Sequence, residues 1–324
     1  MAFEKRNGYS KKIVAMILAA IIITVAIVAL VWYWRNNNEN DNVNGQYARY
    51  RFVYTLVLTS DIAGEIQLNC TIPTDSPNFQ TIQSVNCSVN PSWTIIDEHN
   101  NEIFHFRVSL VPGKTSEVSI MVLVELNKTL CPLPSNSASY NITSPIFQEY
   151  TKSEKYVESD DPLIMEVAQN ITKGCSDPLN ASIAICTWVN QNLDYSGFSD
   201  PARGALWALR NENGDCSEYS DLFIALCRAR GIPARLMDGI ALWLVDSSGT
   251  QSWEKIGHDW AEVYFQNIGW VWVDPTTGDF ACSDGNRLAI QLGQYCSSLS
   301  GGYRYCFTGN ANATERFALN LQVE

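Results

Sequence analysis

The sequence predicts an α+β fold in which an antiparallel β domain precedes a domain of helices and strands. Residues 47–130 form short runs of alternating or β-branched side chains, separated by Gly, Pro, Asn and Asp. Residues 163–172, 179–193 and 219–227 instead carry apolar side chains at helical spacing. Alternation returns in residues 258–274, around a short turn. The first pattern is typical of a β-sandwich, and the later mixture is typical of a separate α+β core.

An uncharged apolar segment of 22 residues, 13–34, precedes these patterns. A helix of this length crosses about 30 Å of hydrocarbon, and its aromatic end, Trp32 to Trp34, suits the membrane interface. Basic residues are concentrated before it, at Lys5, Arg6, Lys11 and Lys12. The segment exceeds the apolar part of a usual signal peptide, and no small-x-small cleavage site follows. We therefore expect an uncleaved single-pass anchor in the cell membrane, with residues 1–12 cytoplasmic and the remainder extracellular.

The linker composition, the net charge and the sequons of the chain are compatible with an extracellular location. Residues 35–46 are polar and Asn-rich, which predicts a flexible linker. The sequence contains 22 Lys+Arg against 34 Asp+Glu, and this net charge of −12 argues against nucleic acid as a partner. The chain has seven N-x-[ST] sequons, whereas chance alone gives about four, so the sequence permits N-glycosylation. The seven sequons are Asn69, Asn86, Asn127, Asn141, Asn170, Asn180 and Asn312.

The ten cysteines fit an oxidising compartment. Cys70 with Cys87 is a candidate disulfide by proximity in sequence, as are two of Cys282, Cys296 and Cys306. Cys186 and Cys227 lie on apolar helix faces and are expected to be packed thiols. No metal site is predicted, because there is no C-x-x-C and His258 is the only histidine after residue 105.

The β-sandwich domain, residues 47–130, is expected to contain strands at 50–58, 65–72, 103–110 and 116–126. His99 and His105 lie in it, and each is expected at a surface or cross-strand position. Residues 131–160 contain three prolines and many Ser and Asn, so they are interpreted as a connecting segment. Beyond them, helices are expected at 163–172 and 179–193, each opened by an Asp-Pro pair that provides an N-cap carboxylate and a proline at N1.

Cys216 is the first candidate for chemistry, because it stands at the predicted start of a helix. Asp215 is a good N-cap and Glu218 follows it by three residues, as in a capping box. Gly231 and Pro233 end the apolar helical pattern. Backbone N–H groups and the helix dipole at this end favour a thiolate and can bind an oxyanion. Taken alone, Cys216 is better interpreted as a buried cysteine or as half of a disulfide.

His258 and Asp274 supply the groups that a nucleophilic thiol requires, a base and a carboxylate to orient it. They lie at the open end of a predicted hairpin whose turn is near residues 266–269. If the loop has an odd number of residues, each residue of one strand pairs with the residue of the other strand whose number completes a sum of 534. The side chains of His258 and Asp274 are then diagonal neighbours on one face of the hairpin. With an even-length loop they face opposite sides unless a bulge intervenes. Pro275 is expected to end the second strand.

Three runs in this order resemble the transglutaminase-like superfamily: Gly-Asp-Cys-Ser-Glu at 214–218, Gly-His-Asp-Trp-Ala-Glu at 257–262 and Trp-Val-Asp-Pro-Thr at 272–276. The resemblance covers residues 161–280, and the β domain less distinctively resembles that of membrane-anchored microbial, especially archaeal, members. It implies a papain-like catalytic domain at 161–280, with Cys216 as nucleophile, His258 as base and Asp274 as the orienting acid. Residues 281–324 resemble no named family and are expected to form an extension that packs on the catalytic domain.

The resemblance implies attack of a thiolate on an amide carbonyl, loss of an amine and resolution of a thioester. A peptidase or amidase is the favoured interpretation, with a peptide or protein substrate and cell-envelope material as one option. The alternatives are a protein-glutamine acyltransferase and a catalytically inactive cell-surface binding module. No cofactor is implied, and no EF-hand-like run suggests calcium.

Members of this superfamily also place an upstream side chain beside the oxyanion. Trp188, Tyr195 and Trp207 are the candidates, and the sequence leaves the choice open. Residues 241–255, with Trp243 and Trp253, lead directly to His258 and could wall a cleft. Arg235 is expected to have a structural role, paired with an acidic residue.

Overall fold

The computed structural model describes residues 47–73, 75–77, 79–97, 99–130, 133, 137–199, 201–245, 253–293, 305–308 and 312–322. Residues 45–324 form one compact unit. The predicted anchor, 13–34, and the linker, 35–46, lie outside the described residues. Within the described ranges, no helix is both long enough and apolar enough to cross a membrane.

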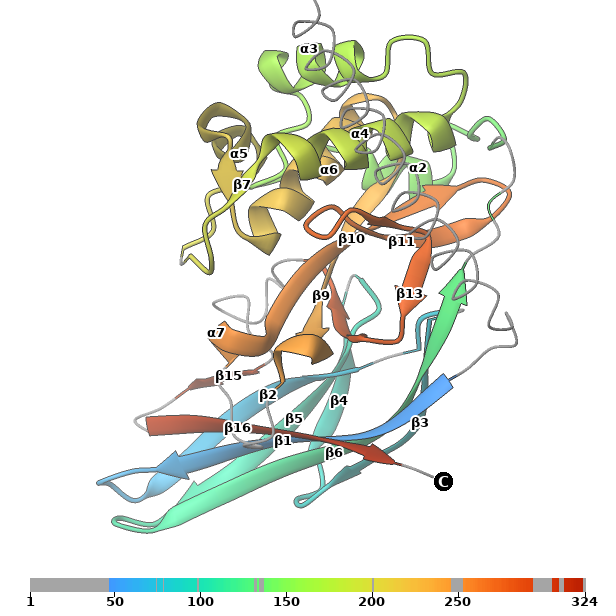
Figure 1. The fold of residues 1–324 in the computed structure, drawn as a ribbon. Helices are drawn as coiled ribbons and strands as arrows, with labels where there is room; N and C mark the ends of the chain where they lie inside the picture. Colours follow the sequence, from blue (N-terminus) through green and yellow to red (C-terminus); the bar gives the residue numbers. More distant parts are fainter. Residues whose placement is uncertain are drawn as a thin grey trace, which may run out of the picture. The chain divides into compact units, whose positions relative to one another are not determined.

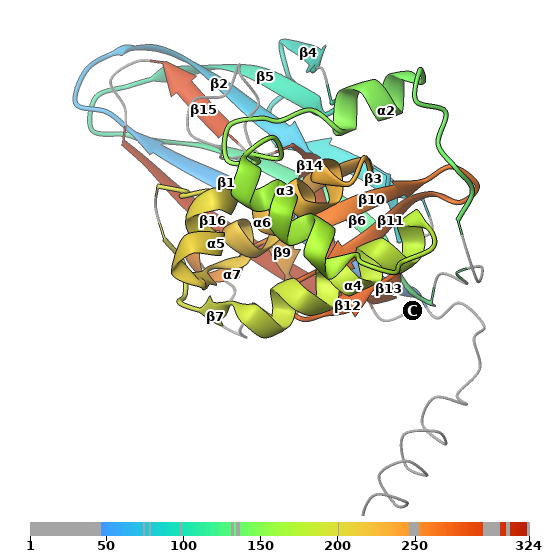
Figure 2. The ribbon, with the colours of Figure 1, turned by 90° about the horizontal axis from the view of Figure 1, so that it is seen from above.

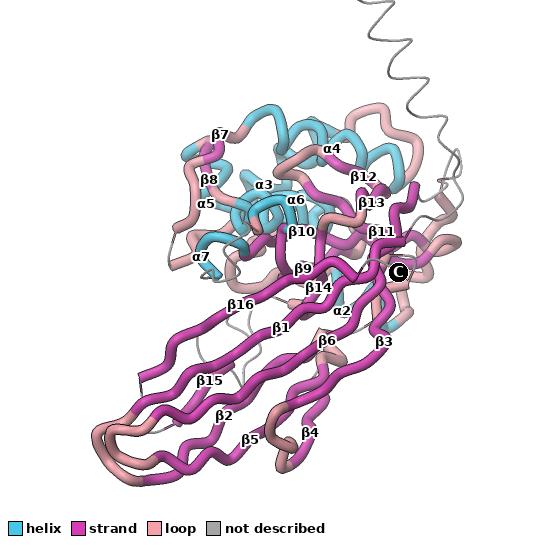
Figure 3. The backbone as a smooth tube through the Cα atoms, turned by 60° about the horizontal axis from the view of Figure 1, so that its bottom comes forward, coloured by secondary structure: helices cyan, strands magenta, loops and turns pink. Residues whose placement is uncertain are grey.

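The N-terminal part consists of antiparallel strands in two sheets (Figure 3). One sheet has the order β13-β6-β1-β16, with β3 also paired to β6. Its strands are β1 (Tyr47–Thr59), β3 (Gln80–Cys87), β6 (Thr115–Leu130), β13 (Cys282–Asp284) and β16 (Asn312–Gln322). The other has the order β15-β2-β5-β4. Its strands are β2 (Gly64–Ile72), β4 (Trp93–Ile96), β5 (Glu102–Leu110) and β15 (Tyr305–Thr308).

Alternation along these strands explains how the two sheets bury a common core. In β1, Phe52, Tyr54, Leu56 and Leu58 are buried while their neighbours are more exposed. Leu56 and Leu58 share one hydrophobic cluster with Leu68 of β2 and Phe106 of β5. A period of two places all of these side chains on the inner faces. The four strands predicted from the sequence are present, and β3 and β4 are added to them.

In the second part of the molecule, helices cover one face of an antiparallel sheet with the strand order β12-β11-β10-β9-β14 (Figure 1). The sheet comprises β9 (Ala234–Ala241), β10 (Gly257–Phe265), β11 (Gly269–Asp274), β12 (Asp279–Phe280) and β14 (Arg287–Leu292). The helices are α2 (Pro145–Tyr150), α3 (Pro162–Ile171), α4 (Pro178–Asn192), α5 (Ala205–Asn211), α6 (Cys216–Ala229), η1 (Leu242–Leu244) and α7 (Trp253–Ile256). A short parallel pair, β7 (Asp194–Tyr195) with β8 (Asn213–Gly214), precedes α6.

Helix α6 is the centre of this second part. Figure 2 shows α3, α4 and α5 gathered around it, over β9 and β10. Its side chains Leu222, Phe223 and Leu226 are fully buried in one cluster with Ala261 and Val263 of β10. Two of the surrounding helices begin as the sequence predicts, because Asp161 and Asp177 accept hydrogen bonds from backbone N–H groups of the first turn and a proline follows each.

The C-terminal extension joins both parts of the molecule. β14 is the edge strand of the second sheet, next to β9, whereas β15 and β16 pair with β2 and β1. Two side-chain amides from the N-terminal part bind the backbone of β14. Gln80 bonds to the N–H and C=O of Ala289 at 2.9 and 2.8 Å, and Asn101 bonds to those of Leu292 at 2.8 Å each. The extension therefore packs on the N-terminal sheets as well as on residues 161–280.

The predicted Cys70–Cys87 disulfide is wrong, because Cys87 carries a free thiol. The two cysteines lie on β2 and β3, which belong to different sheets. Proximity in sequence therefore does not bring them together. Cys186 and Cys227 are buried free thiols, as predicted. Cys296 lies outside the described residues, so the pairing proposed among Cys282, Cys296 and Cys306 stays a prediction.

Candidate active site

Cys216 is the first residue of α6, held there by a capping box. The Asp215 carboxylate accepts the Ser217 N–H at 2.9 Å, and the Glu218 carboxylate accepts the Asp215 N–H at 3.0 Å. Glu218 is fully buried, and Arg203 pairs with it at 2.7 Å. Gly214 leaves the room for this arrangement, since a Cβ there would lie 2.5 Å from the Cβ of Glu218. The local sequence thus fixes the nucleophile candidate at a helix N-terminus.

The electrostatic surroundings of Cys216 keep its sulfur protonated in the resting site. Burial raises the pKa of the thiol well above its ordinary value, and the carboxylates of Asp259 and Asp215 add to that increase. A hydrogen bond from the Asp259 backbone N–H to the sulfur acts in the opposite direction. The helix-terminus effect expected from the sequence is therefore outweighed by burial and neighbouring charge. A thiol in this setting needs a base to take its proton.

His258 and Asp274 are hydrogen-bonded, with 2.7 Å between Nε2 and Oδ2. The hairpin takes the odd-length loop, because Ala261 pairs with Val273 and Phe265 with Gly269. This register places the two residues diagonally on one face, which explains their contact. Both side chains are buried. An ionised carboxylate only accepts hydrogen bonds, so Nε2 carries the proton and Nδ1 is the nitrogen left for a thiol.

Asp274 is held in its ionised form by a full set of donors. Its Oδ1 accepts hydrogen bonds from the backbone N–H groups of Thr276 and Thr277. Its Oδ2 accepts hydrogen bonds from Nε2 of His258 and from two nitrogens of Arg287, Nε at 2.9 Å and Nη2 at 2.7 Å. Although burial opposes it, these contacts with His258 and Arg287 hold the pKa of Asp274 below its usual range. Asp274 therefore remains a carboxylate that can orient the imidazole.

Arg287 is a site residue that the sequence reasoning missed. It is buried on β14, within the extension, and its Nη2 also bonds to Thr277 Oγ1 and to Asp279 Oδ2. One signal could have found it, because a lone arginine opens the otherwise apolar run Arg-Leu-Ala-Ile at 287–290. A buried arginine in such a strand requires an acidic partner.

Trp243 covers the base and the arginine together. Its ring centroid lies 5.3 Å from that of His258, edge to face, and 4.9 Å from Cζ of Arg287. The Trp243 side chain comes from η1 and is 45% exposed, so one side of the indole remains open to solvent. The segment after residue 241 thus supplies a wall beside His258. The side chain of Trp253 lies outside the described part of the chain.

Of the three aromatic candidates for the oxyanion, Tyr195 is the one that the fold brings to Cys216. Tyr195 is aligned with Gly214 in the parallel β7–β8 pair, and it is exposed. Partial desolvation of the side chain, followed by the charge of the neighbouring Cys216, raises the pKa of Tyr195 to about 12. Trp188 and Trp207 instead pack against the hydrophobic core, and Arg203 covers the Trp207 ring at 3.8 Å.

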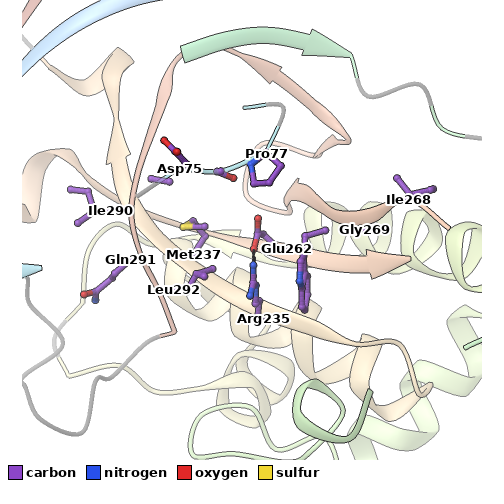
Figure 4. A pocket seen from close by; sticks show the side chains of 13 residues that line it. Asp75, Pro77, Arg235, Met237, Glu262, Ile268, Gly269, Ile290, Gln291 and Leu292 are labelled. Carbon is purple, nitrogen blue, oxygen red and sulfur yellow. Dashed lines mark hydrogen bonds and ion pairs between the residues drawn. The ribbon is translucent and has the colours of Figure 1, made fainter. Parts of the chain in front are cut away.

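A cavity of about 320 Å³ lies on the same sheet but away from these residues (Figure 4). Arg235, Glu262 and Trp270 line it, and none of Cys216, His258 and Asp274 does. Arg235 has the structural role predicted for it. Its guanidinium pairs with Glu262 at 2.6 Å and stacks on Trp270 at 3.9 Å. Across the described ranges, no cluster of His, Cys, Asp or Glu is arranged to hold a metal ion.

Comparisons with known proteins show which family and which fold this chain resembles. Residues 165–275 match the family model of the Transglutaminase-like superfamily. An uncharacterized protein of Haemophilus influenzae is 24% identical over 264 residues, which cover 72% of this chain and 70% of that protein. The uncharacterized protein YebA of Bacillus subtilis is 24% identical over 147 residues, covering 40% of this chain and only 20% of YebA.

The fold also matches a solved structure. A protein from Cytophaga hutchinsonii, described as a "putative cysteine protease", gives a TM-score of 0.63 at 16% identity, covering 86% of this chain and 92% of that one. The segment matched by the family model contains Cys216, His258 and Asp274 and ends before Arg287. The segment that carries the helix-start cysteine and the histidine–aspartate hairpin, residues 165–275, is therefore a transglutaminase-like domain.

Proposed function

We propose that the protein is a thiol amidohydrolase that cleaves amide bonds of peptides or proteins through Cys216, His258 and Asp274. The observation that carries this proposal is the 2.7 Å hydrogen bond between His258 and Asp274. His258 lies on β10, and the next residue of that strand, Asp259, donates its backbone N–H to the sulfur of Cys216. The His258–Asp274 bond and the contact of Asp259 with Cys216 support a base, with its orienting carboxylate, that acts on a nucleophile at a helix N-terminus, as thiol catalysis requires.

In the proposed first step, Nδ1 of His258 takes the proton of Cys216 as the sulfur attacks the carbonyl carbon. A C–S bond forms, and the carbonyl π electrons move to oxygen. Collapse of this intermediate breaks the C–N bond, and the imidazolium returns its proton to the departing amine. Water then attacks the thioester, with His258 as base, and releases the acid and the thiol. Asp274 remains ionised throughout and stabilises the imidazolium.

The oxyanion formed in both steps requires hydrogen-bond donors near Cys216. The backbone N–H of Cys216 belongs to the first turn of α6, where N–H groups have no partner within the helix. The Tyr195 hydroxyl, which is the side chain best placed by the β7–β8 pair, would supply a second donor. Two donors directed at the developing charge are the usual composition of an oxyanion hole.

Residues 13–34 supply the proposed cellular context. Their apolar composition and the basic residues before them support a single-pass anchor in the cell membrane, with the site outside the cell. The substrate would then be extracellular peptide or protein, with cell-envelope material as one option. The seven sequons are compatible with a glycoprotein in this location.

The test measures acyl-enzyme formation and turnover of the full-length chain on a panel of peptide amides. Wild type should release amine and form a thioester adduct on Cys216, and Cys216→Ala should abolish both. Cys175→Ala, at another partly buried cysteine, is the matched control and should behave as wild type. Turnover by Cys216→Ala would overturn the proposal.

Adding a labelled amine separates the competing functions. Incorporation of the amine in place of hydrolysis would identify an acyltransferase. Absence of both reactions, with an alkylation rate of Cys216 that His258→Ala does not change, would support a binding module without catalysis.

A further inference from the structure

The cavity of about 320 Å³, named the Arg235 cavity after one of its lining residues, lies on the face of the sheet that carries His258. Glu262 lines this cavity and follows His258 by four residues on β10, so the two side chains share a face and lie about 13 Å apart. Trp260, between them on that face, is fully buried, and its ring lies 5.1 Å from that of Trp272. A molecule in the Arg235 cavity is therefore separated from the base by this packed pair of indoles.

The guanidinium of Arg235 is held rigidly at this cavity. Its Nε lies 2.7 Å and its Nη2 lies 2.6 Å from Oε2 of Glu262, a buried carboxylate whose Oε1 accepts the indole N–H of Trp272 at 3.1 Å. The ring of Trp270 lies 3.9 Å from the guanidinium carbon, and the ring of Tyr150 lies 5.5 Å from it. These contacts fix the plane and the position of the guanidinium, so little side-chain entropy is lost when a ligand binds to it.

One edge of this guanidinium remains available to a ligand. A guanidinium has five N–H bonds in one plane, and Glu262 accepts one from Nε and one from Nη2. Nη1 and the second hydrogen of Nη2 form the other edge, and no described residue accepts a hydrogen bond from Nη1. The Arg235 side chain is 16% exposed and lines the cavity. Two parallel N–H donors of this kind match the two oxygens of a carboxylate.

Asp75 places a negative charge on the other side of the Arg235 cavity (Figure 4). Its Oδ1 accepts the backbone N–H of Ile82 at 2.6 Å, which orients the exposed carboxylate. Among the residues that the structure describes, no Lys or Arg pairs with Asp75. Because Glu262 already compensates Arg235, the charge of Asp75 gives the cavity a net negative charge. Such a site disfavours a simple anion and favours a ligand that carries a cation together with its carboxylate.

The rest of the lining is mainly aliphatic. Met237 of β9, Ile290 and Leu292 of β14, and Pro77 beside Asp75 all line the cavity. Its volume of about 320 Å³ lies near the lower end of the range for ligand pockets, about 300–1,000 Å³. The ligand is therefore small, and its uncharged part is apolar.

We propose that the Arg235 cavity binds a free amino acid with an aliphatic side chain, in its zwitterionic form. The carboxylate binds the free edge of Arg235, the ammonium group pairs with Asp75, and the side chain packs against Met237, Ile290 and Leu292. This binding is reversible and involves no covalent step. It goes beyond the proposed function, because it assigns a second ligand to a site away from Cys216 and requires no turnover.

The experiment measures binding of three matched probes to the full-length protein by isothermal titration calorimetry at about pH 7. L-leucine should bind with a Kd of about 1 mM or tighter. L-leucinamide, which keeps the ammonium group but has no carboxylate, should bind at least about tenfold more weakly, because it loses the charged hydrogen bonds to Arg235. Isocaproate, which is leucine without its ammonium group, should also bind several-fold more weakly than leucine, because it cannot pair with Asp75.

Two variants locate the site. Arg235→Lys keeps a cation for Glu262 but lacks the planar edge, so it should bind leucine at least about tenfold more weakly than wild type. Asp75→Asn keeps an oxygen for the Ile82 N–H and removes only the charge. It should bind leucine about fivefold more weakly and should bind isocaproate at least as tightly as wild type does. Because Asp75 is exposed, this variant remains informative if Arg235→Lys does not fold. Asp61→Asn, at another exposed position, is the matched control and should behave as wild type.

The absence of saturable leucine binding up to about 10 mM would overturn the proposal, as would equal affinities for leucine and leucinamide. Isocaproate that binds wild type as tightly as leucine would identify an anion site and would also overturn it. Failure of the proposed function is seen separately. Cys216→Ala should bind leucine as wild type does, whether or not this variant retains amide turnover.

Discussion

Arg287 places two guanidinium nitrogens on one oxygen of Asp274, at 2.9 and 2.7 Å. The same oxygen faces the imidazole of His258. Asp274, the proposed orienting acid, is thus held from β14, a strand outside the segment matched by the superfamily model. The C-terminal extension is therefore part of the candidate site through this contact.

Replacing Arg287 by Met should destabilise the protein and reduce its activity at acidic pH. The change leaves the buried Asp274 carboxylate with fewer donors, and breaking such a pair costs about 3–5 kcal/mol. Asp274 should then titrate at a higher pH, so the acidic limb of the pH–rate profile moves upward. Urea unfolding and turnover between pH 4 and 8 measure both effects. Arg107→Met, at an exposed arginine, is the control. An unchanged acidic limb would contradict the role given to Arg287.

The low pKa of Asp274 also predicts how stability depends on pH. Because the folded-state pKa is depressed, the folded protein binds fewer protons than the unfolded chain near pH 4. The stabilisation is fully present above the unfolded pKa, about 3.9, and is lost as pH falls toward the folded value. Unfolding free energies of wild type should therefore decrease below pH 4 more steeply than those of Asp274→Asn. Parallel curves for the two proteins would exclude this contribution.

Gly214→Ala should lower both stability and the rate of Cys216 alkylation. The added Cβ would meet Glu218, whose carboxylate caps α6 and pairs with Arg203. Displacing this buried side chain should cost about 2–3 kcal/mol and move the start of the helix. Gly64→Ala is a matched control, since an added Cβ there meets nothing within 4 Å. Thermal unfolding and alkylation rates distinguish the two variants. Equal effects would show that Gly214 is not needed for this packing.

Gln80→Ala should loosen the attachment of β14 to the N-terminal sheets. Its amide satisfies both the N–H and the C=O of Ala289, and all of these groups are buried. Leaving two buried backbone groups unpaired costs about 2–4 kcal/mol. The exposed Gln67 provides the control variant, Gln67→Ala. Hydrogen exchange at Ala289 should accelerate in the first variant only. Unaltered exchange there would mean that the strand is held by its pairing with β9 alone.

Tyr195→Phe should reduce turnover with little change in stability. The hydroxyl is partly exposed beside Cys216, so its loss removes a donor for the oxyanion without opening a cavity. A decrease of about tenfold or more in kcat is expected, with KM nearly unchanged. Trp207→Phe, at the core-packed candidate, should instead affect stability more than kcat. The reverse pattern would transfer the oxyanion role to Trp207.

Local sequence determined a large part of the candidate site. The capping box, the helix beginning at Cys216, its end near Gly231 and the strands around His258 follow from signals within a few residues of each position. An odd or an even turn would give this hairpin different registers, and the three-residue turn gives the one that joins His258 to Asp274. Short-range rules suffice for these features because the relevant contacts are local or mediated by one turn.

The tertiary structure alone decided which distant groups complete the site. Arg287 reaches Asp274 from β14, Tyr195 is aligned with Gly214 in the β7–β8 pair, and Asp238 pairs with Asp259 between β9 and β10. Each contact depends on strand order and register between segments far apart in the chain, which no local pattern specifies. The same reason explains the incorrect Cys70–Cys87 pairing. What the sequence by itself determined is the chemistry of the site, while the fold decided the charge that surrounds its nucleophile.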